Sequence, residues 1–231
     1  HSLLKKDEPY EPQKLETVYL GYGPREEEID EWIKEARKKP HAAKLSFIEA
    51  SAKTVIEKTA DAIAANKVVG WFQGRQEFGP RALGHRSILA NPTSLEMQDI
   101  LNAKIKHREM FRPFAPSVLR EKADLYFDLR GKESPYMLLV ANVKEEHKKK
   151  LPAITHVDGT ARIQTVTPEN DKRYYDLIKA VGERTGYFAV VNTSFNVRGE
   201  PIVRTLDEAF NCFMHTDIDV LVLGTWIIEK V

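Results

Sequence analysis

The sequence predicts a mixed sheet domain of the α/β or α+β class. Short apolar runs such as residues 68–72 and 187–191 are typical of buried strands. Longer stretches with apolar residues at helical spacing, such as residues 52–66, are typical of helices that pack on one face. The two kinds of segment interleave without a strict strand–helix–strand repeat, which leaves both classes open.

Helices are expected where apolar spacing and end signals agree. In residues 26–38 the acidic side chains lead and the lysines trail, which suits the helix dipole. Capping boxes at residues 93–96 and 205–208 predict two helix starts, because a Ser or Thr and a Glu three residues later cap each other's backbone. Gly186 predicts a helix end. The expected helices are residues 26–38, 52–66, 93–106, 171–184 and one that starts at residues 205–208.

Strands and loops follow from the remaining pattern. Residues 73–92 are so rich in Gly and Pro that we expect a long structured loop without regular structure. Residues 5–27 mix charges with Pro and Gly and predict a linker, so the compact body should begin near Ser51. The charge run over residues 144–150 should be solvated. The expected strands are residues 68–72, 136–143, 161–166, 187–191, 219–223 and 225–228.

Composition limits the function classes. The 231 residues are 42% hydrophobic and carry a net charge of only +1, which argues against a protein that coats nucleic acid. The one cysteine, Cys212, excludes a disulfide framework and a thiolate-rich metal site, so we expect it in the core and the protein in the cytoplasm. No apolar run approaches the ~20 residues that span a bilayer, so no membrane partner is expected. The chain starts at His1 without an initiator Met, which suggests a fragment of a longer protein.

The common nucleotide and hydrolase motifs are missing from the sequence. It has no GxxxxGK followed by Ser or Thr, no GxGxxG after a strand, no HExxH and no GxSxG. Any use of ATP must therefore depend on arginines and lysines gathered around a sheet.

The first polar cluster is the loop that follows the strand at residues 68–72. Its glycines allow backbone N–H groups to approach an anion, and arginine matches phosphate oxygens in bidentate fashion. A surface loop with ordinary ion pairs, such as Arg75 with Glu77, explains it equally well. The cluster consists of Gln73, Arg75, Glu77, Arg81, His85 and Arg86.

The second cluster is residues 102–114, where cations at a helix end run into a Phe/Pro stretch. Compensation of the helix dipole by Lys104, Lys106 and Arg108 is the plain alternative. The sequence FRPFAP should wedge Arg112 between apolar neighbours, where a half-buried guanidinium needs an anionic partner. We therefore predict a ligand role for Arg112.

Two further clusters end strands with polar residues. In residues 156–165, Thr160, Arg162 and Gln164 share one strand face, which a solvated sheet face also explains. The pair His156 and Asp158 is weak evidence for a metal site, and none is expected. The strand at residues 187–191 runs into NTSFN, whose amides and hydroxyls suit the orientation of a phosphate and a small amide, although an Asn/Ser turn is the alternative.

Together these clusters closely resemble the C-terminal domain of the nodulation-protein and antibiotic O-carbamoyltransferases. The match runs from about residue 50 to the end of the chain. It depends on the motifs QGRQEFGPRALGHRSILANP, LNAKIKHREMFRPFAPSVL, HVDGTARIQTV and VVNTSFNVRGEPIVRT, in this order. Residues 1–48 resemble the segment that joins this domain to the family's N-terminal half.

The resemblance implies a YrdC-like fold for residues 49–231, an open twisted mixed sheet flanked by helices. It implies that this domain forms carbamoyl-adenylate from carbamoyl phosphate and ATP, with Mg²⁺ arriving on the ATP. The partner would be a metal-binding, actin-like N-terminal domain of the same protein, which transfers the carbamoyl group to a hydroxyl acceptor. The sequence leaves the acceptor and the oligomeric state open, a homodimer included.

The resemblance also implies roles for individual residues. Lys106, Arg112 and Arg162 are the expected catalytic groups. Arg108 with Lys106, and Asn196 with Ser194, match the KxR and SxN signatures of YrdC-like domains. The expected substrate and nucleotide contacts are Arg81, Arg108, Asn192, Ser194 and Asn196, with Gln73, Arg75 and Thr165 as further candidates.

Two other function classes stay open. YrdC-like domains also occur in tRNA threonylcarbamoylation, so an RNA-binding module is the alternative function, although the near-neutral charge makes nucleic acid an unexpected partner. A catalytically silent nucleotide sensor is the third.

Overall fold

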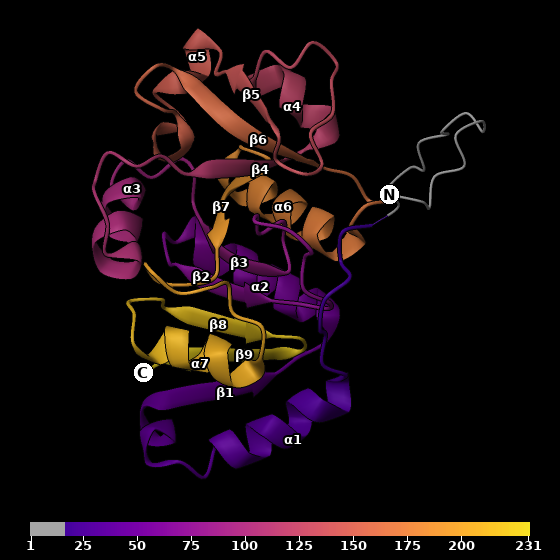
Figure 1. Ribbon diagram of the computed structural model, residues 1–231, viewed down its shortest axis with the longest axis vertical. Helices are drawn as coiled ribbons and strands as arrows, with labels where there is room; N and C mark the ends of the chain where they lie inside the picture. The colour runs from indigo at the N-terminus through magenta and orange to yellow at the C-terminus, as the bar shows by residue number, and fades with distance from the viewer. Residues whose placement is uncertain (1–16) are drawn as a thin grey trace, which may run out of the picture.

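The computed structural model describes residues 17–231, so the predicted linker over residues 5–27 lies mostly outside the described residues. Within that range, nine strands form one sheet in the order β1-β9-β8-β2-β3-β7-β4-β6-β5 (Figure 1). The pairs β2–β8 and β4–β6 are parallel and the other neighbours are antiparallel, so the predicted mixed sheet is confirmed. The strands are β1 (Leu45–Glu49), β2 (Val69–Phe72), β3 (Arg86–Ala90), β4 (Ala115–Leu119), β5 (Leu139–Asn142), β6 (Thr160–Val166), β7 (Ala189–Ser194), β8 (Val220–Leu223) and β9 (Trp226–Lys230).

Helices cover both faces of this sheet (Figure 1). One helix changes type along its length, because α3 continues as the π-helix η2. None of the helices within residues 17–231 combines the length and the apolar character needed to cross a bilayer. The helices are α1 (Glu26–Ala36), α2 (Ala52–Ala64), α3 (Met97–Ile100), η2 (Leu101–Lys106), α4 (Arg120–Tyr126), α5 (Glu145–Lys148), α6 (Lys172–Thr185) and α7 (Leu206–Met214), with short 3₁₀ turns η1 (Pro40–Lys44) and η3 (Pro152–Ile154).

Two apolar clusters hold the layers together, one on each face of the sheet. Successive strand residues point to opposite faces, so Val69 and Trp71 of β2 pack under α2 and α6. Phe72 packs instead in the cluster shared by α1, α3, α4 and α7. The central strands are therefore buried on both sides, which explains why their sequences are apolar runs.

Several end signals act as predicted. Gly186 ends α6 at φ 78°, and Asp171, the first residue of the predicted helix, is its N-cap, where its side chain accepts a hydrogen bond from the backbone N–H of Tyr174. The capping box of Thr205 and Glu208 forms at the start of α7. Short polar side chains thus fix where these helices begin.

Other predictions for local structure were wrong. Residues 73–92 are not all loop, because Arg86–Ala90 form the buried central strand β3 and the glycines and prolines lie on either side of it. The capping box at residues 93–96 does not form, since the Thr93 hydroxyl donates to Asn91 Oδ1 at 2.8 Å and α3 begins at Met97. Strand β4 was missed because its second residue is Pro116.

The compact body also begins earlier than Ser51. Helix α1 buries Ile29 and Ile33 in the core, and β1 pairs along β9 as an edge strand. Residue 48, where the sequence places the domain boundary, thus lies within β1. The segment from Glu26 to Glu49 is part of the same folded unit.

Candidate functional site

A polar pocket of about 130 Å³ lies where strands β4, β6 and β7 meet the loops at residues 80–82 and 108–114. Three guanidinium side chains line it, from Arg81, Arg108 and Arg162. Asn192 and Ser194 at the end of β7 also line it. None of the described residues that line it is Asp or Glu, so this lining is cationic.

The sheet register explains why these residues converge. Ala115 of β4 pairs with Asn192 of β7, and Ser117 pairs with Gln164 of β6. The parallel register therefore puts Ala115 beside Arg162, two residues before Gln164. The small Ala115 side chain thus lies between the larger side chains of Arg162 and Asn192 on the same face of the sheet, and this difference in size leaves a hollow.

The guanidiniums at the pocket are largely free of protein partners. Within residues 17–231, the side chains of Arg81 and Arg162 make no hydrogen bond and no ion pair, and Arg162 Nε is buried without an acceptor. Burial, and then the neighbouring Arg81, lower the pKa of Arg162. An uncompensated cation in such a place is stabilised by a bound anion.

Arg108 is held in place but keeps donors available. Its Nε donates to Asn102 Oδ1 at 2.7 Å, and its guanidinium lies 4.6 Å from the centre of the Phe114 ring. Burial, and then the nearby Arg112, lower the pKa of Arg108. The guanidinium is therefore oriented by one bond and one ring, with its two terminal nitrogens left for a ligand.

Lys106 lies behind the pocket wall, at the end of the π-helix. Its ammonium donates to the backbone carbonyls of Ser194 and Asn196 and to Asn196 Oδ1 at 2.8 Å. Asn196 Oδ1 also accepts from the Ser194 hydroxyl at 2.8 Å. Burial, and then Arg108, lower the pKa of Lys106 to about 7. Lys106 and Asn196 thus hold the end of β7 in place. Of these three residues, Ser194 is the one that lines the pocket.

A buried amide network lies beneath the pocket. Gln164 Nε2 donates to the Leu83 carbonyl at 2.8 Å, and Gln164 Oε1 accepts from the Ser117 hydroxyl at 2.6 Å. Asn192 Nδ2 donates to this network, whereas Asn192 Oδ1 is buried without a donor among residues 17–231. Neither Ser117 nor Gln164 was predicted as a site residue from the sequence. The signal for Gln164 was its place two residues after Arg162, on the same strand face.

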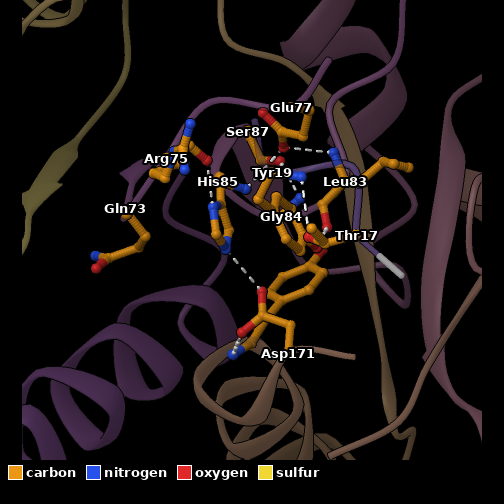
Figure 2. Close-up of polar contacts among 12 residues, drawn as sticks. Thr17, Tyr19, Gln73, Arg75, Glu77, Leu83, Gly84, His85, Ser87 and Asp171 are labelled. Carbon is orange, nitrogen blue, oxygen red and sulfur yellow. Dashed lines mark hydrogen bonds and ion pairs between the residues drawn. The ribbon is translucent and has the colours of Figure 1, made fainter. Parts of the chain in front are cut away.

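A network of hydrogen bonds holds the loop before β3 together (Figure 2). One oxygen of Glu77 accepts from the backbone N–H groups of Leu83, His85 and Arg86 at 2.7, 2.8 and 3.2 Å. The His85 ring contacts the Arg75 carbonyl and the Asp171 carboxylate, and it stacks on Tyr19 with ring centroids 3.7 Å apart. This network fixes the backbone that carries Arg81 and Ala82 to the pocket.

The remaining arginines of this loop are used internally. Arg86 is fully buried and donates to four backbone carbonyls, those of Tyr22, Gln73, Gly74 and His85. Arg75 donates to the carbonyls of Leu20 and Gly21, and so fastens the N-terminal segment onto the loop.

The structure therefore brings together five of the eleven predicted site residues at the pocket: Arg81, Arg108, Arg162, Asn192 and Ser194. Lys106 and Asn196 support them from behind. Gln73 is buried and its side chain points away from the loop network, Arg75 fastens the N-terminal segment, and Thr165 Oγ1 accepts from the Ser134 N–H at 2.8 Å. These last three do not line the pocket.

Arg112 does not occupy the predicted position between apolar neighbours. Its side chain is 52% exposed, and its Nε lies 3.0 Å from Glu109 Oε2. The reason is that Phe114 turns inward as the chain enters β4, whereas Phe111 and Arg112 stay in the exposed turn before it. Arg112 lies close enough to Arg108 to affect its pKa, so it stands near the pocket without lining it.

No group of three or more His, Cys, Asp or Glu side chains within the described range 17–231 is placed to hold a metal ion. Asp171 has protein partners at both oxygens and Glu77 at Oε1, whereas Glu77 Oε2 is buried without a partner among residues 17–231. A divalent cation at this site would depend on oxygens that a ligand brings.

Comparison with known proteins gives a consistent result. The family model described as "Carbamoyltransferase C-terminus" matches residues 60–230. Nodulation protein NolO of Bradyrhizobium diazoefficiens is 47% identical over 178 residues, which cover 76% of this chain and 32% of NolO. The 3'-hydroxymethylcephem-O-carbamoyltransferase of Amycolatopsis lactamdurans is 39% identical over 171 residues, 74% of this chain and 32% of that enzyme. An uncharacterized protein of Synechocystis sp. is 46% identical over 95% of this chain and 38% of its own length.

The chain thus spans about a third of the length of these relatives. Among solved structures, YciO of E. coli matches with a TM-score of 0.52 and 11% identity, over 74% of this chain and 78% of YciO. Sua5 of P. abyssi matches with a TM-score of 0.51 and 14% identity, over 76% of this chain and 49% of Sua5. At such low identity these structures bear on the fold alone, and they confirm the expected YrdC-like arrangement.

Proposed function

Because the chain belongs to the carbamoyltransferase C-terminus family, we propose that its cationic pocket binds carbamoyl phosphate and that the domain forms carbamoyl-adenylate from it with ATP. The observation that carries this proposal is the set of three guanidiniums around a pocket of about 130 Å³, two of them without a hydrogen-bond or ion-pair partner among residues 17–231. That volume suits a small acyl phosphate and is too small for a nucleoside triphosphate.

The residues at the pocket suit the phosphate of such a ligand. Arg81 and Arg162 offer unpaired donors, and Arg108 offers its terminal nitrogens. Charge-assisted hydrogen bonds of this kind contribute roughly 1.5–3 kcal/mol each. The Ser194 hydroxyl and the Asn192 amide add neutral contacts for the carbamoyl group.

The proposed chemistry has two steps. Water cleaves carbamoyl phosphate to carbamate and phosphate. A carbamate oxygen then bonds to the α-phosphorus of ATP, the bond from that phosphorus to the bridging oxygen breaks, and pyrophosphate leaves. Both steps need positioning and stabilisation of negative charge, and neither needs a protein nucleophile.

The nucleotide has to extend beyond the pocket. Arg112 and Arg198 lie exposed outside it, both near Glu109, and are candidates for contacts with the triphosphate. Mg²⁺ brought with ATP would supply positive charge that favours the departure of pyrophosphate. The chain's own cations then hold the other reactant.

Transfer of the carbamoyl group to a hydroxyl acceptor would fall to another part of a longer protein. The relatives are about three times the length of the matching region. We propose that the partner is the actin-like, metal-binding N-terminal domain expected from the sequence, with a cytoplasmic location.

Exchange of labelled pyrophosphate into ATP tests the adenylation step. Exchange should require carbamoyl phosphate, and Arg162→Gln or Arg81→Gln should lower its rate by about a hundredfold or more. Lys179→Ala, which removes an exposed charge from α6, is the matched control and should exchange normally. Exchange that proceeds without carbamoyl phosphate, or that both arginine variants retain, would rule the proposal out.

A further inference from the structure

Three buried polar side chains form a layer beneath the pocket. Ser117, Gln164 and Asn192 come from the neighbouring strands β4, β6 and β7 and are 0%, 3% and 2% exposed. Polar groups buried this deeply are costly unless their hydrogen bonds are satisfied. The direction of each bond in the layer therefore decides which atoms stay unsatisfied.

The Gln164 amide has only one orientation compatible with its partners. One of its terminal atoms lies 2.8 Å from the Leu83 carbonyl, which can only accept, so this atom is the nitrogen. The other terminal atom is then the oxygen Oε1. It accepts from the Ser117 hydroxyl at 2.6 Å and from Asn192 Nδ2 at 3.0 Å.

The Asn192 amide is oriented by the same logic. One of its terminal atoms lies near three acceptors: the Ala82 carbonyl at 3.1 Å, Ser117 Oγ at 2.9 Å and Gln164 Oε1 at 3.0 Å. This atom must be the nitrogen, because a carbonyl cannot donate. This leaves Asn192 Oδ1, an atom of a residue that lines the pocket, buried and without a donor in the described part of the chain.

An acceptor is the one property that the charged groups of the pocket lack. The guanidiniums of Arg81, Arg108 and Arg162 only donate, so they hold any phosphate group equally well. They cannot separate carbamoyl phosphate from an acyl phosphate of the same size with a methyl group in place of the amide. A fixed acceptor can, because it pairs with an N–H and stays unpaired against a methyl group.

We infer that Gln164 and Ser117 are positioning residues that hold Asn192 so that its Oδ1 accepts an N–H of the carbamoyl amide. This inference rests on the proposed function and adds the origin of substrate selectivity. The pocket then selects acyl phosphates that carry an N–H donor over those that lack one. Gln164 and Ser117 do not touch the ligand.

Equilibrium binding of carbamoyl phosphate and of acetyl phosphate tests this without need of ATP. The unsubstituted chain should bind carbamoyl phosphate about tenfold more tightly or better, as expected for one extra hydrogen bond. Gln164→Met, of similar volume but without donors or acceptors, should bring the ratio of the two affinities to about one and leave acetyl phosphate binding within about threefold.

Thr216→Val is the matched control, because it removes a buried hydroxyl that donates to the Cys212 carbonyl at the end of α7, away from the pocket. A residue with a merely structural role would lower both affinities together and leave their ratio unchanged. Thr216→Val should therefore retain the selectivity of the unsubstituted chain.

The outcomes separate the two claims. Binding of neither compound to the unsubstituted chain would overturn the proposed function and this inference together. Equal binding of both would overturn the inference alone, and so would a Gln164→Met variant that keeps the preference. If Gln164→Met does not fold, Ser117→Ala decides. A fall of about threefold or more in the ratio supports the inference, and an unchanged ratio overturns it.

Discussion

The loop over residues 73–85, together with Arg86 at the start of β3, and the wall of the pocket both carry arginines, but these arginines have opposite roles. Arg86, the first residue of β3, is fully buried, and its two terminal nitrogens donate to four backbone carbonyls, although its Nε has no acceptor among residues 17–231. Arg162 in the pocket wall has no partner among residues 17–231. An arginine that donates to the protein's own carbonyls stabilises the local fold. An arginine whose donors have no protein partner is available to bind an anion.

The electrostatic surroundings follow the same division. Burial lowers the pKa of Arg86 to about 10, but the nearby Glu77 carboxylate opposes this. For Arg162 burial also lowers the pKa, and its neighbour Arg81 adds to the effect. The positive charge of Arg86 is thus balanced by a carboxylate of the protein, whereas the positive charge of the pocket would be balanced by an anionic ligand.

The largest expected effect is on the loop side. Arg86→Met should lower the free energy of unfolding by about 3–5 kcal/mol, because it leaves carbonyls without donors and Glu77 without its nearby cation. Urea denaturation followed by circular dichroism measures this loss. Arg162→Met is the control and should leave stability nearly unchanged, since no group within residues 17–231 accepts a hydrogen bond from the Arg162 side chain. If both variants lose stability equally, the division between the two regions fails.

The sequence predicted the fold better than it predicted which arginines bind the protein's own backbone and which are available for a ligand. Apolar runs and caps located most elements, because their signals are local, as with Asp171 and Gly186 of α6. Strand β3 was missed because the glycines beside Arg86–Ala90 dominate that stretch, and β4 because of Pro116. In both strands the pairing partners from distant segments decide the structure.

For the site, the sequence located the segments that line the pocket. It could not show which of their arginines line the pocket and which donate to the protein's own groups. The partners of Arg75 and Arg86 are backbone carbonyls, which every residue has and no residue letter reveals. Arg112 was misplaced because its burial was argued from its neighbours in sequence, whereas the turn before β4 leaves it exposed. Gln164 went unassigned because its importance comes from Asn192 and Ser117 on two other strands.

The second prediction fills the hollow between Arg162 and Asn192. Ala115→Leu should place a bulky side chain in the pocket and weaken binding of carbamoyl phosphate by about a hundredfold or more, at a cost in stability of roughly 1–3 kcal/mol. Calorimetric titration and thermal melts measure the two effects. Ala115→Ser adds one atom and should still bind. Unchanged binding by the leucine variant would mean that the ligand lies elsewhere.

The third prediction concerns Lys106, a cation with protein partners directly behind the pocket. The pKa of Lys106 is about 7 in the folded chain and ordinarily 10.5. Between these two pH values the unfolded chain therefore binds more protons at this side chain than the folded chain does. The contribution of Lys106 to the free energy of unfolding should therefore rise with pH from about 7 to 10, by at most about 1.4 kcal/mol per pH unit. The measurement is the stability difference between the unsubstituted chain and Lys106→Met over that range. A difference that does not change with pH would mean that the surrounding oxygens keep the ammonium charged throughout.

The smallest expected effect is at Arg112, which lies between the two cases because its one partner is an exposed carboxylate. Exposed pairs like Arg112 with Glu109 contribute about 0.2–1 kcal/mol, so Arg112→Ala should hardly change stability. Its effect on ATP affinity should be severalfold and should fade at high salt, because exposed charges are screened. Glu109→Gln should act in the opposite direction, since it releases both Arg112 and Arg198 towards the triphosphate. If Arg112→Ala instead abolishes pyrophosphate exchange as fully as Arg162→Gln does, an arginine with a protein partner takes part directly in the chemistry, and the distinction drawn from the two regions does not hold.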